Sequence, residues 1–139
     1  MIYIGSDHRG YTLKEKVKFW LQEWNLEFED MGNDHLDPGD DYPDFAKKVA
    51  EKLGEIGDKG IVICASGVGV DVCVNRHPKV RCGLGYALGQ VKAARNDDAV
   101  VLAKFCYSIW FLFITFRVQP MNLRFDAFVC GRVFDGFQN

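Results

Sequence analysis

The chain alternates short apolar runs with longer stretches in which apolar residues recur every three or four positions. The strand-like runs are 1–5, 26–32, 60–65, 80–85 and 99–103. The intervening stretches predict helices that include 13–24, 43–53, 67–76 and 87–96. The run at 60–65 is nearly all apolar, as expected of a strand covered on both faces. This alternation predicts an α/β protein whose parallel sheet carries helices on both faces.

The first two predicted helices are amphipathic. In the first, the apolar positions are Leu13, Val17, Trp20, Leu21 and Trp24, and the polar positions assigned to the opposite, solvent side are Lys14, Glu15, Lys18 and Glu23. In the second, the apolar face comprises Phe45, Ala46, Val49, Ala50 and Leu53. Pro43 suits the first turn of that second helix.

Composition narrows the function classes. The 139 residues are 48% hydrophobic and 26% charged, with a net charge of −2. This length favours a single domain that spans residues 1–139. The net charge is slightly negative, so the chain offers no basic surface that would attract nucleic acid. The longest uncharged run, 105–116, is shorter than the roughly 20 residues that span a bilayer. The first residues lack a signal-peptide pattern, so we expect a cytoplasmic protein that does not engage a membrane.

The positions of the cysteines and of two of the three histidines do not indicate a metal centre. The five cysteines are Cys64, Cys73, Cys82, Cys106 and Cys130, and none has zinc-ligand spacing. We therefore expect reduced thiols, and packing roles for all but Cys64. His35 lies in an acidic loop and His77 precedes a proline, so we expect both to be solvated.

The carboxyl ends of parallel strands are where ligands bind in such sheets, which directs attention to three loops. They are Ser6 to Gly10, Cys64 to Gly69, and the segment near Arg95 to Asp97. The first loop, "GSDHRG", places Asp7 and His8 at this edge. The alternative is that Ser6 or Asp7 only caps the following helix.

The loop after the third strand, "CASGVG", is the second candidate. Gly67 and Gly69 allow backbone N–H groups to face inward at a helix start, where an anion is favoured. The same environment is expected to lower the pKa of the Cys64 thiol, which would make it a general base. The alternative is that Cys64 is a small hydrophobic residue ending a core strand. The loop is neither a Walker loop nor GxGxxG, which argues against a nucleotide.

Four segments together resemble the ribose-5-phosphate isomerase B family, which includes the galactose-6-phosphate isomerase subunits. They are "IGSDHRGYTLKE" at the start, "DYPDFAKKVAE" at 41–51, "GIVICASGVGVDVCVNRHPKVR" at 60–81 and "RNDDAVVLA" at 95–103. The resemblance covers roughly 1–103. It implies a Rossmann-like three-layer sandwich with a five-stranded parallel sheet, no cofactor, and a homodimer or dimer of dimers with sites across the interface.

The resemblance also implies a reaction: metal-free aldose–ketose isomerisation of a sugar phosphate through a cis-enediolate, with ribose 5-phosphate and ribulose 5-phosphate as the default pair. The residues expected to be catalytic are Cys64 as base, Asp7, and Ser66, whose hydroxyl stands where the family has threonine. The residues expected to bind substrate are His8, Ala65, Gly67, Val68, Gly69 and Asn96. The loop Ala65–Gly69 would donate hydrogen bonds to the enediolate.

The sequence departs from this family at Arg95, where the family has a histidine that helps to open the sugar ring. Arginine is always charged and cannot readily take that role. Ring opening then falls to Asp7, His8 or a water, or the substrate is already open. Arg95 itself either binds phosphate or lies at a solvated helix end.

The C-terminal segment 104–139 departs further. Tyr107 stands where the first phosphate-binding arginine of the family would be, and Arg132 echoes the second, but Gly136 follows in place of the next arginine. Arg117 and Arg124 are candidate substitutes. The apolar residues of this segment include Phe105, Trp110, Phe111, Phe113 and Phe116. Such a surface predicts a dimerisation segment.

Three other functions stay open on these grounds. The first is a hexose 6-phosphate isomerase, favoured by the change at Arg95. The second is a non-catalytic homologue that binds sugar phosphates, favoured by the missing arginines and histidine. The third is a flavodoxin-like mononucleotide binder, which shares the fold but needs a phosphate loop after the first strand.

Overall fold

The computed structural model describes residues 1–53, 58–78, 80–84, 93 and 101–103. Its elements are β1 (Ile2–Ser6), α1 (Tyr11–Glu23), β2 (Phe28–Asp30), α2 (Tyr42–Lys52), β3 (Lys59–Ile63), α3 (Val68–Val74), β4 (Cys82–Leu84) and β5 (Val101–Ala103). The predicted alternation of strand and helix is confirmed across these elements. The predicted helix over 87–96 falls outside the described residues except at residue 93.

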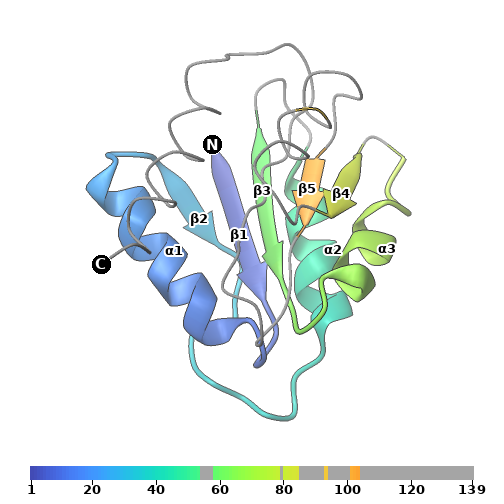
Figure 1. Cartoon of the computed structure of the whole chain (residues 1–139), viewed down its shortest axis with the longest axis horizontal. Coiled ribbons are helices and arrows are strands. Elements are labelled where there is room, and N and C mark those ends of the chain that lie inside the picture. The colour runs from blue at the N-terminus through green and yellow to red at the C-terminus, as the bar shows by residue number, and fades with distance from the viewer. Residues whose placement is uncertain (54–57, 79, 85–92, 94–100, 104–139) are drawn as a thin grey trace.

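The strands are parallel, as predicted, and form two hydrogen-bonded groups (Figure 1). The first group has the order β2-β1-β3, and the second pairs β4 with β5. β5 packs alongside β3, so the two groups adjoin. The α/β class and the parallel sense are therefore confirmed, while one continuous five-stranded sheet stays a prediction.

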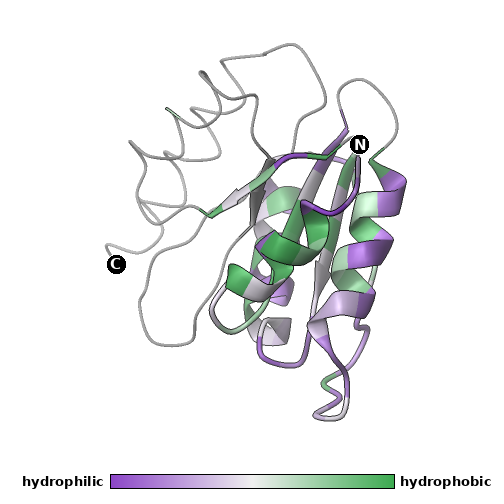
Figure 2. Cartoon of the chain, turned by 90° about the vertical axis from the view of Figure 1, so that its right-hand side faces the viewer, coloured by the Kyte–Doolittle hydropathy of each residue, from purple (hydrophilic) through white to green (hydrophobic). Residues whose placement is uncertain are grey.

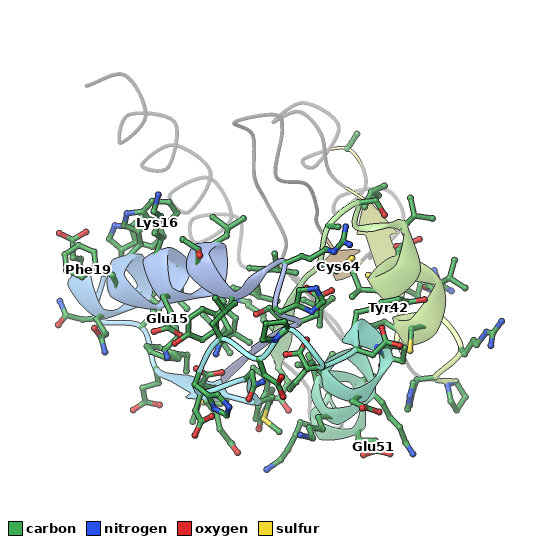
Figure 3. The ribbon with its side chains drawn as sticks, turned by 90° about the horizontal axis from the view of Figure 1, so that it is seen from below. Glu15, Lys16, Phe19, Tyr42, Glu51 and Cys64 are labelled. Atoms are coloured by element: carbon green, nitrogen blue, oxygen red, sulfur yellow. The ribbon has the colours of Figure 1, made fainter. Side chains whose placement is uncertain are left out.

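The helices cover both faces of the three-stranded group. An added Cβ at Gly5 of β1 would lie 3.0 Å from Cγ2 of Val49, which places α2 directly against that face. α1 lies on the other side, as the view along the strands shows (Figure 3). The buried apolar residues between these layers include Ile2, Ile4, Val17, Leu21, Ala46, Val49, Val62 and Ile63. All five apolar positions predicted for α2 are buried, which confirms its amphipathic pattern.

Helix α1 departs from its predicted pattern at Lys14. This side chain is fully buried, although the sequence pattern assigns it to the solvent side. Its Nζ donates to both carboxylate oxygens of Asp30, at 2.7 and 2.6 Å, and to the carbonyl of Asn33 at 2.5 Å. Lys18 Nζ lies 2.6 Å from Asp30 Oδ2. A buried ammonium needs such partners because it has lost its hydration. The prediction that Lys14 faces solvent was therefore wrong, because its partners Asp30 and Asn33 lie 16 and 19 positions away in the sequence.

The elements that border the predicted loops begin and end at positions slightly different from those predicted. β3 ends at Ile63, so Cys64 follows the strand and does not belong to it. α1 has Gly10 as its N-cap with no side-chain cap, so neither Ser6 nor Asp7 caps it. At α2, in contrast, the Asp41 side chain accepts from the N–H of Tyr42, and a proline occupies the first turn as predicted.

Helix α3 is apolar on more than one side (Figure 2). Val70 and Val74 are buried, whereas Val68 and Val72 are 52% and 49% exposed.

In the described residues no helix is long and apolar enough to cross a membrane.

Candidate active site

Strand pairing brings the two predicted catalytic loops together. In the parallel pair β1–β3, Ser6 is the partner of Ile63, so Asp7 and Cys64 are the next residues along adjacent strands. Both are only 4% exposed. Figure 3 looks onto this edge, with Cys64 labelled between the starts of α1 and α3. The strand register therefore places these two residues next to each other at the carboxyl edge of the sheet.

Gly10 allows this close approach. A Cβ built at Gly10 would lie 2.6 Å from the carbonyl oxygen of Ile63 and 2.9 Å from its Cγ2. Because one of these atoms belongs to the backbone, it cannot move away without shifting β3. The absence of a side chain at Gly10 thus lets the start of α1 lie against the end of β3.

We expect Gly10→Ala to lower the free energy of unfolding by about 1–3 kcal/mol, the usual cost of overpacking. Urea denaturation followed by circular dichroism measures this. Gly39→Ala is the matched control, because its Cβ would meet only the Asp37 side chain, at 3.3 Å in an exposed loop. Equal stability of the two variants would contradict the tight contact at Gly10.

The Cys64 thiol is buried and held by the loop that follows it. The N–H of Gly67 donates to Sγ at 3.3 Å. Burial raises the pKa of the Cys64 thiol, and the nearby Asp7 charge raises it further. Backbone N–H groups of Val70, Gly67 and Ser66 act in the opposite direction but do not outweigh burial. The prediction of a lowered thiol pKa was therefore wrong for the free protein.

The remaining residues of the loop surround the thiol in a fixed turn. Gly67 adopts a left-handed φ of 80° as the N-cap of α3. Ser66 is exposed, and its Oγ accepts from the N–H of Val68 at 3.3 Å. A Cβ at Gly69 would lie 2.7 Å from Cζ of Tyr42, so the ring of Tyr42 packs on the start of α3. Ala65 is half-buried between the strand and this turn.

Asp7 is a buried carboxyl beside the thiol. Its Oδ1 accepts from the N–H of Gly10 at 2.9 Å. Burial raises the pKa of Asp7, and although the Gly10 N–H and the adjacent His8 lower it, burial outweighs them. Because burial disfavours the ionised form of both groups, and the Asp7 charge adds to this at Cys64, the pair is suited to holding and moving a proton.

His8 points away from this pair toward the loop that follows β2. Its backbone N–H and its Nδ1 lie 2.7 and 2.9 Å from Oδ1 of Asp40. The Asn33 amide donates to Oδ2 of Asp40 at 3.0 Å. The hydrogen bond with Asp40 raises the pKa of His8. Burial opposes ionisation of Asp40, but the donors from His8 and Asn33 outweigh it and hold the pKa of Asp40 below its usual value.

Asp40 and Asn33 were not predicted from the sequence. Because β2 lies next to β1 in the sheet, the loop after β2 reaches the same carboxyl edge as Asp7 and His8. The signal was therefore the strand order, which would have added this loop to the three already considered. No local motif marks either residue.

The predicted packing cysteines in the described part of the chain behave as expected. Cys73 is half-buried, with its Sγ 3.8 Å from the carbonyl of Pro43. Cys82 is buried, and burial and the nearby Asp71 raise its pKa far above the usual thiol range. His35 is exposed and pairs with Asp34.

Several predicted residues lie outside the described ones. They are Asn96, Arg95 and Arg132 among the proposed substrate contacts, Tyr107, Arg117 and Arg124, Cys106 and Cys130, and the apolar residues of 104–139. Among the residues that the structure does describe, no group of three or more His, Cys, Asp or Glu side chains is arranged to hold a metal.

Comparison with known proteins finds matches to sugar-phosphate isomerases. A family model described as "Ribose/Galactose Isomerase" matches residues 2–104. Ribose-5-phosphate isomerase B of Mycobacterium tuberculosis is 35% identical over 98 residues, which make up 70% of this chain and 60% of that protein. The match thus spans less than two thirds of that relative's length.

Solved structures agree with these matches. Ribose-5-phosphate isomerase B of Clostridium thermocellum aligns with a TM-score of 0.68 and 32% identity, over 76% of this chain and 71% of that chain. The Mycoplasma genitalium protein of the same name, solved with bound ribulose-5-phosphate, aligns with a TM-score of 0.66 and 33% identity, over 76% of this chain and 70% of that chain.

Proposed function

The chain belongs to the Ribose/Galactose Isomerase family, and on that premise we propose that it interconverts ribose 5-phosphate and ribulose 5-phosphate. The observation that carries the proposal is the pairing of Asp7 and Cys64 at adjacent strand ends, with the turn of Gly67 beside the thiol. An aldose–ketose isomerase needs a base near C2 and C1 and fixed donors near the reacting oxygens.

We assign Cys64 as the base of the reaction. Its thiolate takes the proton from C2 of the open-chain aldose, and the electron pair of that C–H bond forms the C1–C2 double bond. The carbonyl oxygen on C1 thereby gains the negative charge of a cis-enediolate. The thiol then returns the proton to C1, the hydroxyl proton on O2 moves to O1, and the C2 carbonyl of the ketose forms. Atoms and charge balance, and the step requires no metal.

The neighbouring groups support this chemistry. Backbone N–H groups at the start of α3 stabilise a developing oxyanion without reorganisation, because the turn already fixes their direction. The raised pKa of Cys64 makes its thiolate a strong base once formed, which suits a weakly acidic C–H bond. We assign proton transfer between the sugar oxygens and ring opening to Asp7, and a supporting catalytic role to the exposed hydroxyl of Ser66.

The remaining assignments concern the ends of the substrate. We place His8 at the phosphate end, as the family resemblance implies, and the partly exposed ring with its raised pKa favours an imidazolium that can donate to an anion. Arg95 and Arg132 are proposed to add charge there, and Asn96 to hold sugar oxygens; these three lie outside the described residues.

The purified protein, incubated with ribose 5-phosphate and a metal chelator, is expected to form ribulose 5-phosphate, followed by the absorbance of the ketose. Turnover only after a divalent metal is added would contradict the metal-free step. Turnover of galactose 6-phosphate or allose 6-phosphate in place of ribose 5-phosphate would overturn the substrate, and no turnover of any of them would overturn the function.

A further inference from the structure

We propose that Asp40 is a positioning residue of the substrate site, which holds the His8 ring by its Nδ1 proton so that Nε2 donates to the phosphate of the sugar phosphate. The proposal rests on the proposed function, because it needs His8 at the phosphate end. It assigns to the loop after β2 a part in substrate binding.

One carboxylate oxygen of Asp40 fixes both the backbone and the ring of His8. Oδ1 lies 2.7 Å from the backbone nitrogen and 2.9 Å from Nδ1. Since the pKa of Asp40 is held below its usual value, this oxygen is an acceptor, and Nδ1 must be the donor. A proton on Nδ1 leaves Nε2 as the ring nitrogen available to a ligand.

The carboxylate is itself held in place from the opposite side. Its Oδ2 accepts from the Asn33 amide at 3.0 Å, and the carbonyl of Asn33 accepts from the buried Lys14 at 2.5 Å. The side chain of Asp40 is 7% exposed, whereas that of His8 is 27% exposed. The anchoring group is therefore buried, and the group it orients reaches solvent, as binding of an anion requires.

The charges around His8 favour its cationic form. Asp7 precedes it in the loop after β1, and Asp40 faces it from the loop after β2; both raise the pKa of His8. Cys64 at the end of β3 lies beside Asp7. An imidazolium donates from both nitrogens, so with Asp40 on Nδ1 the second donor matches a phosphate oxygen. As pH rises through the pKa of His8, Nε2 loses its proton and can no longer donate, so phosphate affinity falls.

Asp40→Asn tests the proposal because it keeps the shape of the side chain and removes its charge. NMR titration of the three histidines, with His8→Gln to assign the signal, is expected to show the pKa of His8 lowered by about one unit, a tenfold change in its protonation equilibrium. KM for ribose 5-phosphate at pH 7.5 is expected to rise about tenfold, as for a lost charge-assisted hydrogen bond, with kcat within about twofold.

Asp34→Asn is the matched control, since it removes the carboxylate of the exposed His35–Asp34 pair, whose side chains are 72% and 92% exposed. This variant is expected to leave the pKa of His8 and KM unchanged. The same changes in both variants would overturn the proposal, as would an unmoved His8 pKa in Asp40→Asn. A fall in kcat at constant KM would also overturn it, because Asp40 would then act on the chemistry.

If the wild-type protein lacks turnover, the proposed function fails but Asp40 is still tested. Inorganic phosphate then serves as the probe, added to the free protein while the His8 signal is followed. Weaker phosphate binding in Asp40→Asn than in Asp34→Asn supports the positioning role. Equal binding in both variants overturns it.

Discussion

Replacement of Cys64 by alanine is expected to lower kcat by about 10²- to 10⁴-fold, the usual contribution of a general base, with ribose 5-phosphate affinity retained. Cys64 is 4% exposed and follows the strand that pairs with the strand before Asp7. Alanine keeps the small apolar volume at the end of β3 and removes only the ionisable group. The effect therefore falls on the transition state and not on binding. Steady-state kinetics and ligand-induced thermal shifts measure the two quantities.

The kcat of the wild-type protein is expected to depend on pH through the ionisation of Cys64. Because burial raises the pKa of Cys64, the thiolate forms above the ordinary thiol pKa of about 8.5, and kcat is expected to keep rising through that region. Cys73→Ala is the matched control, since its thiol is half-buried between α2 and α3, and it should retain both the rate and the pH profile. Residual activity of Cys64→Ala with an unchanged profile would show that another group is the base.

Asp30→Asn is expected to lower the free energy of unfolding by about 3 kcal/mol, within the range for removing one partner of a buried ion pair. The fully buried ammonium of Lys14 then loses the carboxylate that it contacts at 2.6 and 2.7 Å. Glu15, 3.4 Å from the same nitrogen, compensates in part. Such a loss is a large fraction of the 5–15 kcal/mol that typically stabilises a domain. Urea denaturation at pH 7 measures it.

The stabilisation by the ion pair of Lys14 and Asp30 is expected to depend on pH. Burial opposes ionisation of Asp30, but hydrogen bonds from Lys14, Lys18 and the Gly32 N–H outweigh it, so the pKa of Asp30 is lowered. This stabilisation is present above the unfolded pKa of about 3.9 and is lost as pH falls through the folded pKa. The difference between the wild type and Asp30→Asn should therefore shrink in acid.

Two further variants decide whether the buried charge is the cause. Glu29→Gln removes the neighbouring exposed pair with Lys52, and its expected cost is about 0–1 kcal/mol. Lys14→Met combined with Asp30→Asn should be less destabilising than the sum of the single variants, because no unpaired charge stays buried. An Asp30→Asn variant no less stable than Glu29→Gln would contradict this account.

The order of elements and the two candidate loops could be predicted because they depend on local patterns. Apolar runs of five or six residues mark β1 and β3, and the rule that ligands bind at the carboxyl edge singled out Asp7 and Cys64. Their adjacency then follows from the parallel register of Ser6 with Ile63. The resemblance to a known family named the reaction, which the pattern alone leaves open.

The features that the sequence could not predict depend on long-range contacts. Lys14 reads as a solvent-facing helix residue until Asp30 and Asn33 are placed against it, 16 and 19 positions away. Asp40 contacts His8 although the two residues are 32 positions apart, and no sequence motif indicates this contact. The sign of the Cys64 pKa shift also escaped prediction, because it is the difference between opposed effects of burial and backbone N–H groups.

The central claim is that Cys64 moves the proton between C2 and C1, and isotope exchange in D₂O tests it most directly. The thiol exchanges its proton with the solvent before returning it, so ribose 5-phosphate incubated with the wild-type protein should acquire deuterium at C2. The ribulose 5-phosphate formed should acquire it at C1, as proton NMR detects. Cys64→Ala should show neither, and Cys73→Ala should show both. Deuterium incorporation by Cys64→Ala at the wild-type rate would contradict the account.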